Sequence, residues 1–430
     1  MYGWLTRWTF DPSAQGTDYF FTAQADSLLD GHLWVNQKAF GFDNECFYVS
    51  GRCYGYFGLT PSFLRIPFLL IAGPTTQSFA TVMIPLATGV AFGASLDLCR
   101  QFAKTIAEQQ RGVVFMFVAA LTLGPGSVLV LLADPYVYQE AIAWSIAGVM
   151  LAVNFFWRWS QSGKSRYLNL AILFCIFAAG ARPTTFAVGA VLGISIFVVR
   201  RKQLSPGIDD AIASMCFIVL PTLFSFGVLF AKFGQPSPPP DGYKNSTGVV
   251  VEKSKLPCYL PFDNHPKYVP TNLLAYLRPD AVRIYRDWPN VRFRFNVCIG
   301  PNHPTYLWPL KPGDMYVEKT TSLSNTMPIP LAAVGFGFFQ AFRQKRPTEL
   351  ILLVAVATSG LLVTMTFGMT SRYLGDFYPL LASGLAISAT VLGSAKRKSV
   401  LVVLTCIAIG LTLWSLLANA SLLTRYGITN

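Results

Sequence analysis

The chain has 430 residues, of which 53% are hydrophobic and 13% are charged. That charged fraction is about half of the roughly 25% found in ordinary soluble domains, which excludes a soluble domain with a simple anchor. The net charge of +13 comes from short basic clusters between apolar runs. Because no nucleic-acid-binding motif accompanies these clusters, nucleic acid is not expected as a partner. We therefore expect an all-α integral membrane protein.

The chain begins with a polar segment, residues 1–75, that no apolar run precedes in this sequence. Its first ten residues, MYGWLTRWTF, look like the interfacial end of a helix, where aromatic side chains gather at the membrane surface. We expect the natural protein to carry one more span upstream. That span would raise the number of membrane helices from about 10 to 11.

Ten apolar runs follow, most of them near the roughly 20 residues needed to cross about 30 Å of hydrocarbon. They lie at 76–98, 112–132, 137–157, 167–181, 184–199, 210–232, 327–342, 349–369, 376–393 and 399–418. The two runs on either side of Arg182 are short, so they form either two spans or one broken helix. The second arrangement would reverse the orientation of everything downstream.

The connecting loops decide between these arrangements, because short cytoplasmic loops collect Lys and Arg. Five loops carry three such cations each, and they fall on one side only if both short runs span: Arg100, Lys104 and Arg111; Arg158, Lys164 and Arg166; Arg200, Arg201 and Lys202; Arg343, Lys345 and Arg346; Lys396, Arg397 and Lys398. The chain then divides into a first extracytoplasmic loop (1–75), a helix bundle (76–232), an extracytoplasmic loop that forms a small cap (233–326) and C-terminal membrane helices (327–430).

Four of the eight cysteines fall in the two predicted extracytoplasmic loops, where disulfides persist. Cys46 and Cys53 flank the stretch FYVSGR, which suits a hairpin closed by a disulfide, and Cys258 and Cys298 are candidates for a second pair. Four unpaired thiols are the alternative. The other four cysteines lie in or beside apolar runs, where cysteine usually acts as a small apolar side chain.

Motifs of familiar soluble enzymes are absent from the sequence. There is no Gly-rich phosphate loop, paired CxxC or HExxH, and the three histidines are scattered. His265 and His303 each stand in Asn-His-Pro, which is ordinary turn chemistry. No metal site is predicted, no cofactor is certain, and a divalent cation is left open.

The first loop carries the most specific pattern of the chain. It reads GTDYFFTAQADSLLDGHLWV from Gly16 and continues to an aromatic run, GYFGLTP, at 55–61. This pattern resembles the first loop of the C-fold membrane glycosyltransferases, which include protein mannosyltransferases and the aminoarabinose transferases of lipid A. In that family an acid after the first span precedes a helix of the form YxxxAxxLLxxG, and a Tyr-Gly-Pro-Pro-like segment returns to the membrane. The matching residues here are Asp18; Ala25, Leu28, Leu29 and Gly31; Tyr56, Gly58 and Pro61.

The resemblance implies transfer of a sugar from a polyprenyl-phosphate donor to an extracytoplasmic glycan, lipid or protein acceptor. Asp18 is the expected general base, which takes the proton of the acceptor hydroxyl. The family's acidic pair, often Asp-Glu, appears here as Asp18-Tyr19. Asp26 and Asp43 are therefore substitute bases, and Asp43 is also a candidate for substrate binding.

Arg182 and Arg372 are the candidates for binding the donor phosphate, because each is a single cation on the otherwise cation-poor outer face. Snorkelling or an ion pair with Asp376 or Glu140 is the alternative for either arginine. Glu140 is a further candidate for substrate binding. Its alternative is a helix N-terminal acid that complements the helix dipole.

A transporter or flippase of lipid-linked sugars is the competing function, since it would share the many spans and the loop charges. Such proteins usually contain inverted repeats and broken helices at matching positions, and the sequence has no such symmetry. A non-catalytic assembly protein is a third interpretation. For the glycosyltransferase we expect a multi-pass protein of the bacterial plasma membrane, with its active site on the extracytoplasmic side.

Overall fold

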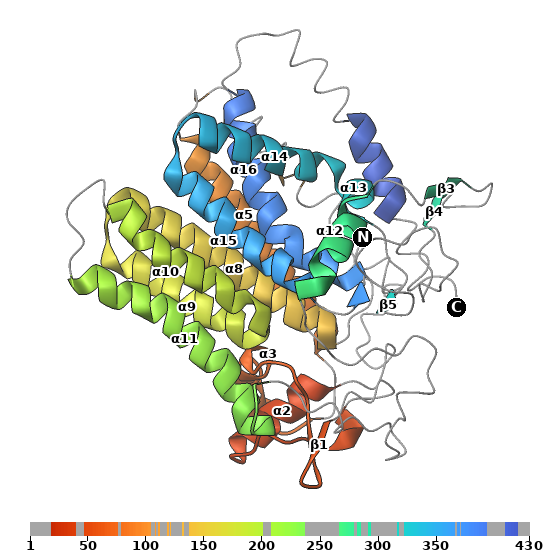
Figure 1. The fold of residues 1–430 in the computed structure, drawn as a ribbon. Coiled ribbons are helices and arrows are strands. Elements are labelled where there is room, and N and C mark those ends of the chain that lie inside the picture. Colours follow the sequence, from red (N-terminus) through yellow and green to blue (C-terminus); the bar gives the residue numbers. More distant parts are fainter. Residues whose placement is uncertain are drawn as a thin grey trace.

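The computed structural model describes residues 19–39, 47–75, 79–104, 137–200, 208–236, 266–278, 322–365, 371–393 and 409–419, with short pieces at 108, 111, 118–119, 121, 131–132, 282–284, 291–293, 316–317 and 368–369. Long helices form a bundle, and elements from the first 75 residues gather at one end of it (Figure 1). Strands are confined, within the described residues, to three small two-stranded sheets.

Eight of the predicted apolar runs are confirmed as helices: α5 (Ala80–Ala103), α8 (Val137–Ser162), α9 (Ser165–Ala181), α10 (Phe186–Arg200), α11 (Ile208–Phe233), α14 (Pro328–Arg343), α15 (Pro347–Val363) and α16 (Tyr378–Gly393). Of these, α5, α8 and α11 are long and apolar enough to cross a membrane. Most of the run at 112–132 lies outside the described residues, and of the run at 399–418 a helix Ile409–Asn419 is described. The total number of spans stays a prediction.

Helix α8 forms the centre of the bundle, where it packs against α5 and α9. Its most apolar 18 residues are 89% buried, whereas the corresponding stretch of α11 is only 28% buried. The exposed side chains of α11 include Ile212, Met215, Leu223 and Phe230, which recur at helical spacing along one face. An apolar face of this kind suits contact with lipid.

The chain reverses direction at Arg182, between α9 and α10. Arg182 has extended backbone angles, φ −145° and ψ 116°, because the following Pro183 disfavours the helical conformation. A short 3₁₀ turn, η2 (Pro183–Thr185), then leads into α10. Gly189 of α10 faces Cys175 of α9, and these residues lie equally far from Arg182, so the two helices run antiparallel. The two short runs are therefore separate helices.

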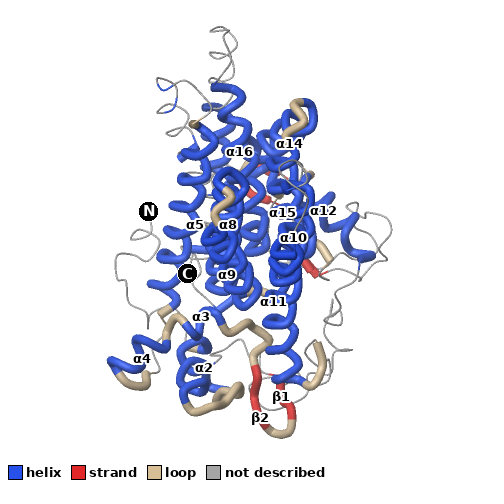
Figure 2. The backbone as a smooth tube through the Cα atoms, turned by 90° about the vertical axis from the view of Figure 1, so that its left-hand side faces the viewer, coloured by secondary structure: helices blue, strands red, loops and turns tan. Residues whose placement is uncertain are grey.

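The first segment folds beneath the ends of α9 and α11 (Figure 2). Its described elements are α2 (Phe20–Leu29), η1 (Gln37–Ala39), β1 (Phe47–Val49), β2 (Arg52–Tyr54), α3 (Thr60–Phe63) and α4 (Ile66–Ala72). The predicted helix with a Gly31 stop is present as α2, and Gly31 has a φ of 77°, which glycine adopts without strain. The strands pair antiparallel, with Tyr48 opposite Cys53.

Part of the predicted cap is described and packs onto the bundle. Its elements are η5 (Pro266–Tyr268), α12 (Val269–Leu277), β3 (Val282–Ile284), β4 (Val291–Phe293), β5 (Tyr316–Val317) and α13 (Leu323–Thr326). Strand β5 pairs in parallel with β6 (Gly368–Met369), which precedes a 3₁₀ helix, η6 (Ser371–Phe377). Tyr276 of α12 is fully buried against Phe377 of η6, with ring centroids 5.4 Å apart. The predicted domain boundaries stay predictions.

Candidate functional site

Two arginines from distant parts of the chain converge on one tyrosine. The guanidinium carbon of Arg182 lies 5.0 Å from the ring centroid of Tyr373, and that of Arg372 lies 5.8 Å from the same centroid. Arg372 also lies 4.0 Å from the ring centroid of Tyr138, at the start of α8. Asp376 completes the group. We call Arg182, Arg372, Tyr138, Tyr373 and Asp376 the arginine site.

Helix packing places the η6 part of this site. Gly375 lies against Ile142 of α8, and a Cβ at Gly360 of α15 would overlap the ring of Phe377, so η6 approaches both helices closely. The hydroxyl of Ser359 donates a hydrogen bond to the main-chain oxygen of Asp376 at 3.1 Å. These contacts hold η6 where its arginine and aspartate reach the turn that follows α9.

The arginine site carries more positive than negative charge. Nη2 of Arg182 lies 3.1 Å from Oδ2 of Asp376, whose side chain is 1% exposed. The contact is an ion pair without hydrogen-bond geometry, because Oδ2 accepts no hydrogen bond from the described residues. Nε of Arg182 also makes no hydrogen bond there. The donor capacity of Arg182 is therefore only partly used among the described residues, since guanidinium offers five N–H groups and its Nε is buried without a hydrogen bond.

The predicted alternative of an ion pair with Asp376 is therefore correct for Arg182. It does not exclude the predicted phosphate-binding role, because the two arginines together exceed the charge of Asp376 by one. Arg372 packs on aromatic rings, as guanidinium groups commonly do. The sequence selected both arginines but not their convergence on Tyr373.

Glu140 forms a buried ion pair with a residue that the sequence analysis did not select. Nη1 and Nη2 of Arg65 donate hydrogen bonds to the two carboxylate oxygens of Glu140 at 2.6 and 2.8 Å. Nη1 of Arg65 also donates to the main-chain oxygen of Pro61 at 3.1 Å. The two side chains are 3% and 1% exposed. The pair joins the first segment to α8, and a substrate role of Glu140 stays a prediction.

Lys232, near the end of α11, is a second residue that the sequence analysis missed. It is buried, and Nζ donates hydrogen bonds to the main-chain oxygens of Gly55 and Phe57 at 3.0 and 2.8 Å. The signal for both missed residues is a lone cation in an apolar stretch, LRIPF for Arg65 and FAKF for Lys232. Such cations require partners when they are buried.

Five predicted site residues lie outside the described residues: Asp18, Asp43, Cys46, Cys258 and Cys298. Cys53 is disulfide-bonded, and the described cysteines Cys99, Cys175 and Cys216 are free. The pairing of Cys53 with Cys46, and of Cys258 with Cys298, stays a prediction. Within the described part of the chain, no group of three or more His, Cys, Asp or Glu side chains could hold a metal ion.

A shallow pocket, whose space of about 200 Å³ includes open solvent, is lined in part by residues that neighbour Arg182 in the sequence. Its walls come from residues 56–59, from Gly180 and Pro183, and from the α11 stretch 224–229. Pro183 follows Arg182 directly, and the α11 wall is mostly apolar, with Phe224, Val228 and Leu229.

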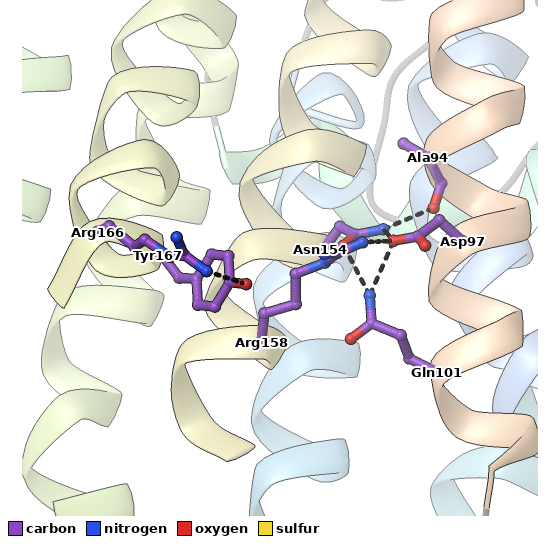
Figure 3. Close-up of polar contacts among 7 residues, drawn as sticks. All are labelled: Ala94, Asp97, Gln101, Asn154, Arg158, Arg166 and Tyr167. Carbon is purple, nitrogen blue, oxygen red and sulfur yellow. Dashed lines mark hydrogen bonds and ion pairs between the residues drawn. The ribbon is translucent and has the colours of Figure 1, made fainter. Parts of the chain in front are cut away.

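A different polar cluster lies near the other end of α8 (Figure 3). Oδ2 of Asp97 accepts hydrogen bonds from Gln101, Asn154 and Arg158 at 2.8, 2.7 and 2.5 Å. Asn154 also donates to the main-chain oxygen of Ala94 at 3.0 Å. We call Asp97, Gln101, Asn154 and Arg158 the Asp97 network. Its members bond mainly to one another and join α5 to α8.

No family model and no curated protein sequence matches this chain. Among solved structures, it is similar to an oligosaccharyltransferase from Archaeoglobus fulgidus in the apo form, with 12% identity and a TM-score of 0.43 over 97% of this chain and 53% of that one. It is also similar to the archaeal oligosaccharyltransferase AglB from the same organism in complex with an inhibitory peptide and a dolichol-phosphate, with 12% identity and a TM-score of 0.44 over 95% and 52% of the two chains. The chain spans about half the length of these proteins, and the similarity is too distant to assign an activity.

Proposed function

We propose that the arginine site holds the phosphate of a polyprenyl-phosphate-linked sugar and that the chain transfers this sugar to an extracytoplasmic glycan, lipid or protein acceptor. The convergence of Arg182 and Arg372 on Tyr373 carries the proposal. Arginine suits this task because its planar fork matches phosphate oxygens. The resemblance of the first segment to C-fold glycosyltransferases supports the same reaction.

The charge of the site suits the leaving group better than the intact donor. A phosphodiester carries one negative charge, whereas the released polyprenyl phosphate carries about −1.5 to −2. A site with two guanidinium groups and one carboxylate therefore binds the released polyprenyl phosphate more strongly than the phosphodiester. This preference favours the step in which the bond between the anomeric carbon and the phosphate oxygen breaks.

The acceptor hydroxyl forms the new bond. Its oxygen attacks the anomeric carbon while a carboxylate takes the hydroxyl proton, and the phosphate oxygen leaves with the bonding electrons. Asp18 is the proposed base, with Asp43 as the substitute.

The position of the arginine site favours an enzyme over a transporter. Transporters usually bind their substrate near the middle of the membrane, between broken helices. Arg182 instead follows the last residue of α9, and Tyr138 lies in the first turn of α8. The site therefore lies at helix ends, where a lipid head group resides.

A transfer assay tests the proposal. Purified protein in lipid nanodiscs receives a panel of radiolabelled polyprenyl-phosphate sugars and candidate acceptors, and both transfer and lipid flipping are measured. We expect transfer with one donor, and its loss in Arg182→Gln and in Arg372→Gln. The control is Arg166→Gln, which removes an exposed arginine at the other end of α9. Flipping without transfer, or full transfer by both variants, would contradict the proposal.

A further inference from the structure

The segment Gly55–Thr60, here called the return segment, is fixed at three points by contacts that leave little freedom. A Cβ at Gly55 would overlap the ring of Phe20 in α2. Lys232 donates hydrogen bonds to two main-chain oxygens of the segment. The hydroxyl of Thr60 donates to the main-chain oxygen of Phe177 in α9 at 2.9 Å. The segment is therefore held between α2, α11 and α9.

One contact of the return segment leads to Arg182. Gly58 lies so close to α9 that a Cβ there would overlap the main-chain oxygen of Gly180. Gly180 stands two residues before Arg182, and the amide of Arg182 donates to the main-chain oxygen of Ala178 at 2.9 Å. Gly58 thus contacts the last turn of α9, whose end sets the direction of Arg182.

A second contact leads to Arg372. The ring of Phe57 meets the ring of Tyr138 edge to face, with centroids 5.2 Å apart. The ring of Tyr138 also contacts the guanidinium group of Arg372, whose Cζ lies 4.0 Å from the ring centroid. Tyr56 stacks on Phe57 at 4.4 Å and reinforces the group. A shift of Phe57 therefore moves the surface on which Arg372 rests.

The use of a buried lysine to hold the return segment is costly, because an ammonium group loses its water there. Apolar packing would fasten a loop at less cost. Two hydrogen bonds from one Nζ, however, fix the positions of the Gly55 and Phe57 carbonyl groups in a way that apolar contact cannot. The arrangement favours accurate placement of Phe57 and Gly58.

We propose that the return segment is a positioning element for the arginine site. Gly58 fixes the position of Arg182 through the last turn of α9, and Phe57 fixes the position of Arg372 through the ring of Tyr138. Lys232 holds Phe57 and Gly58 in place. This inference rests on the proposed function, because it concerns the phosphate-binding geometry of the same site. None of the three residues needs to touch the donor. Each acts through an arginine that does.

A double-mutant cycle tests the link to Arg182. The affinity for polyprenyl phosphate without sugar is measured in nanodiscs for Gly58→Ala, Arg182→Gln and the double variant. We expect Gly58→Ala to weaken binding about tenfold, within the range of coupling between residues in one network, and to add nothing in the Arg182→Gln background. The control is Gly89→Ala in α5, where a Cβ meets nothing within 4 Å. Equal losses in both backgrounds would overturn the proposal.

Phe57→Leu provides a second test, which does not depend on whether Gly58→Ala folds. It keeps an apolar side chain but removes the ring that contacts Tyr138. We expect Phe57→Leu to weaken phosphate binding in the native background but not in the Arg372→Gln background, and to lower the thermal unfolding midpoint modestly in both, because Phe57 is buried among aromatic rings. Unchanged binding in folded Phe57→Leu would overturn the positioning role. If Arg182→Gln and Arg372→Gln bind normally, the phosphate site itself is wrong and both proposals fall.

Discussion

The arginine site and the Asp97 network lie near opposite ends of α8: Tyr138 is 16 residues from Asn154 and 20 from Arg158, or roughly 24 to 30 Å at a rise of 1.5 Å per residue. Both contain arginine and aspartate, but the side chains are used differently. In the Asp97 network one carboxylate oxygen accepts three hydrogen bonds, and Asn154 bonds to both neighbours of that carboxylate. In the arginine site the contacts are mainly an ion pair and ring stacking.

The difference indicates which cluster can accept a ligand. A network whose donors and acceptors satisfy one another stabilises the contact between two helices and has little to offer a third partner. Guanidinium groups held over aromatic rings have fewer hydrogen-bond partners, as the unsatisfied Nε of Arg182 shows among the described residues. We therefore expect substitutions at the arginine site to change activity more than stability, and substitutions in the Asp97 network to do the reverse.

The largest effect is expected from the proposed base. Asp18→Asn should lower sugar transfer by about 10² to 10⁴, the usual contribution of a general base, because an amide cannot take the acceptor proton. Expression and thermal unfolding should change little. The control is Asp26→Asn in α2, which should cost much less. Near-normal transfer by Asp18→Asn, with its loss in Asp43→Asn, would show that the residue-level match to the family is wrong.

Glu140→Gln should act mainly on stability, although Glu140 lies close to the arginine site. Removing one charge from the buried pair leaves Arg65 uncompensated, which costs about 3–5 kcal/mol of unfolding free energy. Denaturant unfolding in detergent measures this loss. The double variant Arg65→Met with Glu140→Gln should recover a large part of it. Unchanged stability with lost transfer would instead make Glu140 a substrate ligand.

The sequence predicted the helices better than their ends. Hydropathy placed a span at 76–98, whereas α5 runs from Ala80 to Ala103, because its hydrogen bonds continue into the polar turn that contains Arg100 and Gln101. The break at Arg182 was predictable from charge alone, and Pro183 gives its local cause. The local sequence was therefore sufficient to predict that these helices exist and where the chain breaks between α9 and α10.

The candidate site was predictable only in part. Arg182 and Arg372 were selected because single cations on a cation-poor face are conspicuous. Their convergence was not predictable, since it depends on how η6 packs against α8 and α15. The partner of Glu140 was missed for the same reason: Arg65 lies 75 residues away, and loop-to-helix contacts leave no periodic pattern. Tertiary contacts decided which charges pair.

A smaller effect is expected from a substitution at Arg372 that tests whether the charge or the planar shape of its side chain determines phosphate affinity. Arg372→Lys keeps the positive charge but removes the planar group that lies over Tyr138. We expect affinity for polyprenyl phosphate to fall about tenfold, close to the contribution of a desolvated cation–π contact. Arg158→Lys, in the Asp97 network, should leave this affinity unchanged. Equal affinities for Arg372→Lys and the native protein would mean that charge alone matters there.

The smallest effect is expected at Asp97. Hydrogen bonds to a charged group contribute about 1.5–3 kcal/mol when buried, but the side chains of Asp97 and Arg158 are 32% and 34% exposed, so water replaces part of the interaction. Asp97→Asn should therefore lower the unfolding free energy by about 1 kcal/mol, measured by denaturant unfolding, while the KM for the donor stays constant. Arg166→Gln, outside the network, should change neither quantity. A raised KM in Asp97→Asn without loss of stability would show that this end of α8 communicates with the arginine site, and the division of roles between the two clusters would fail.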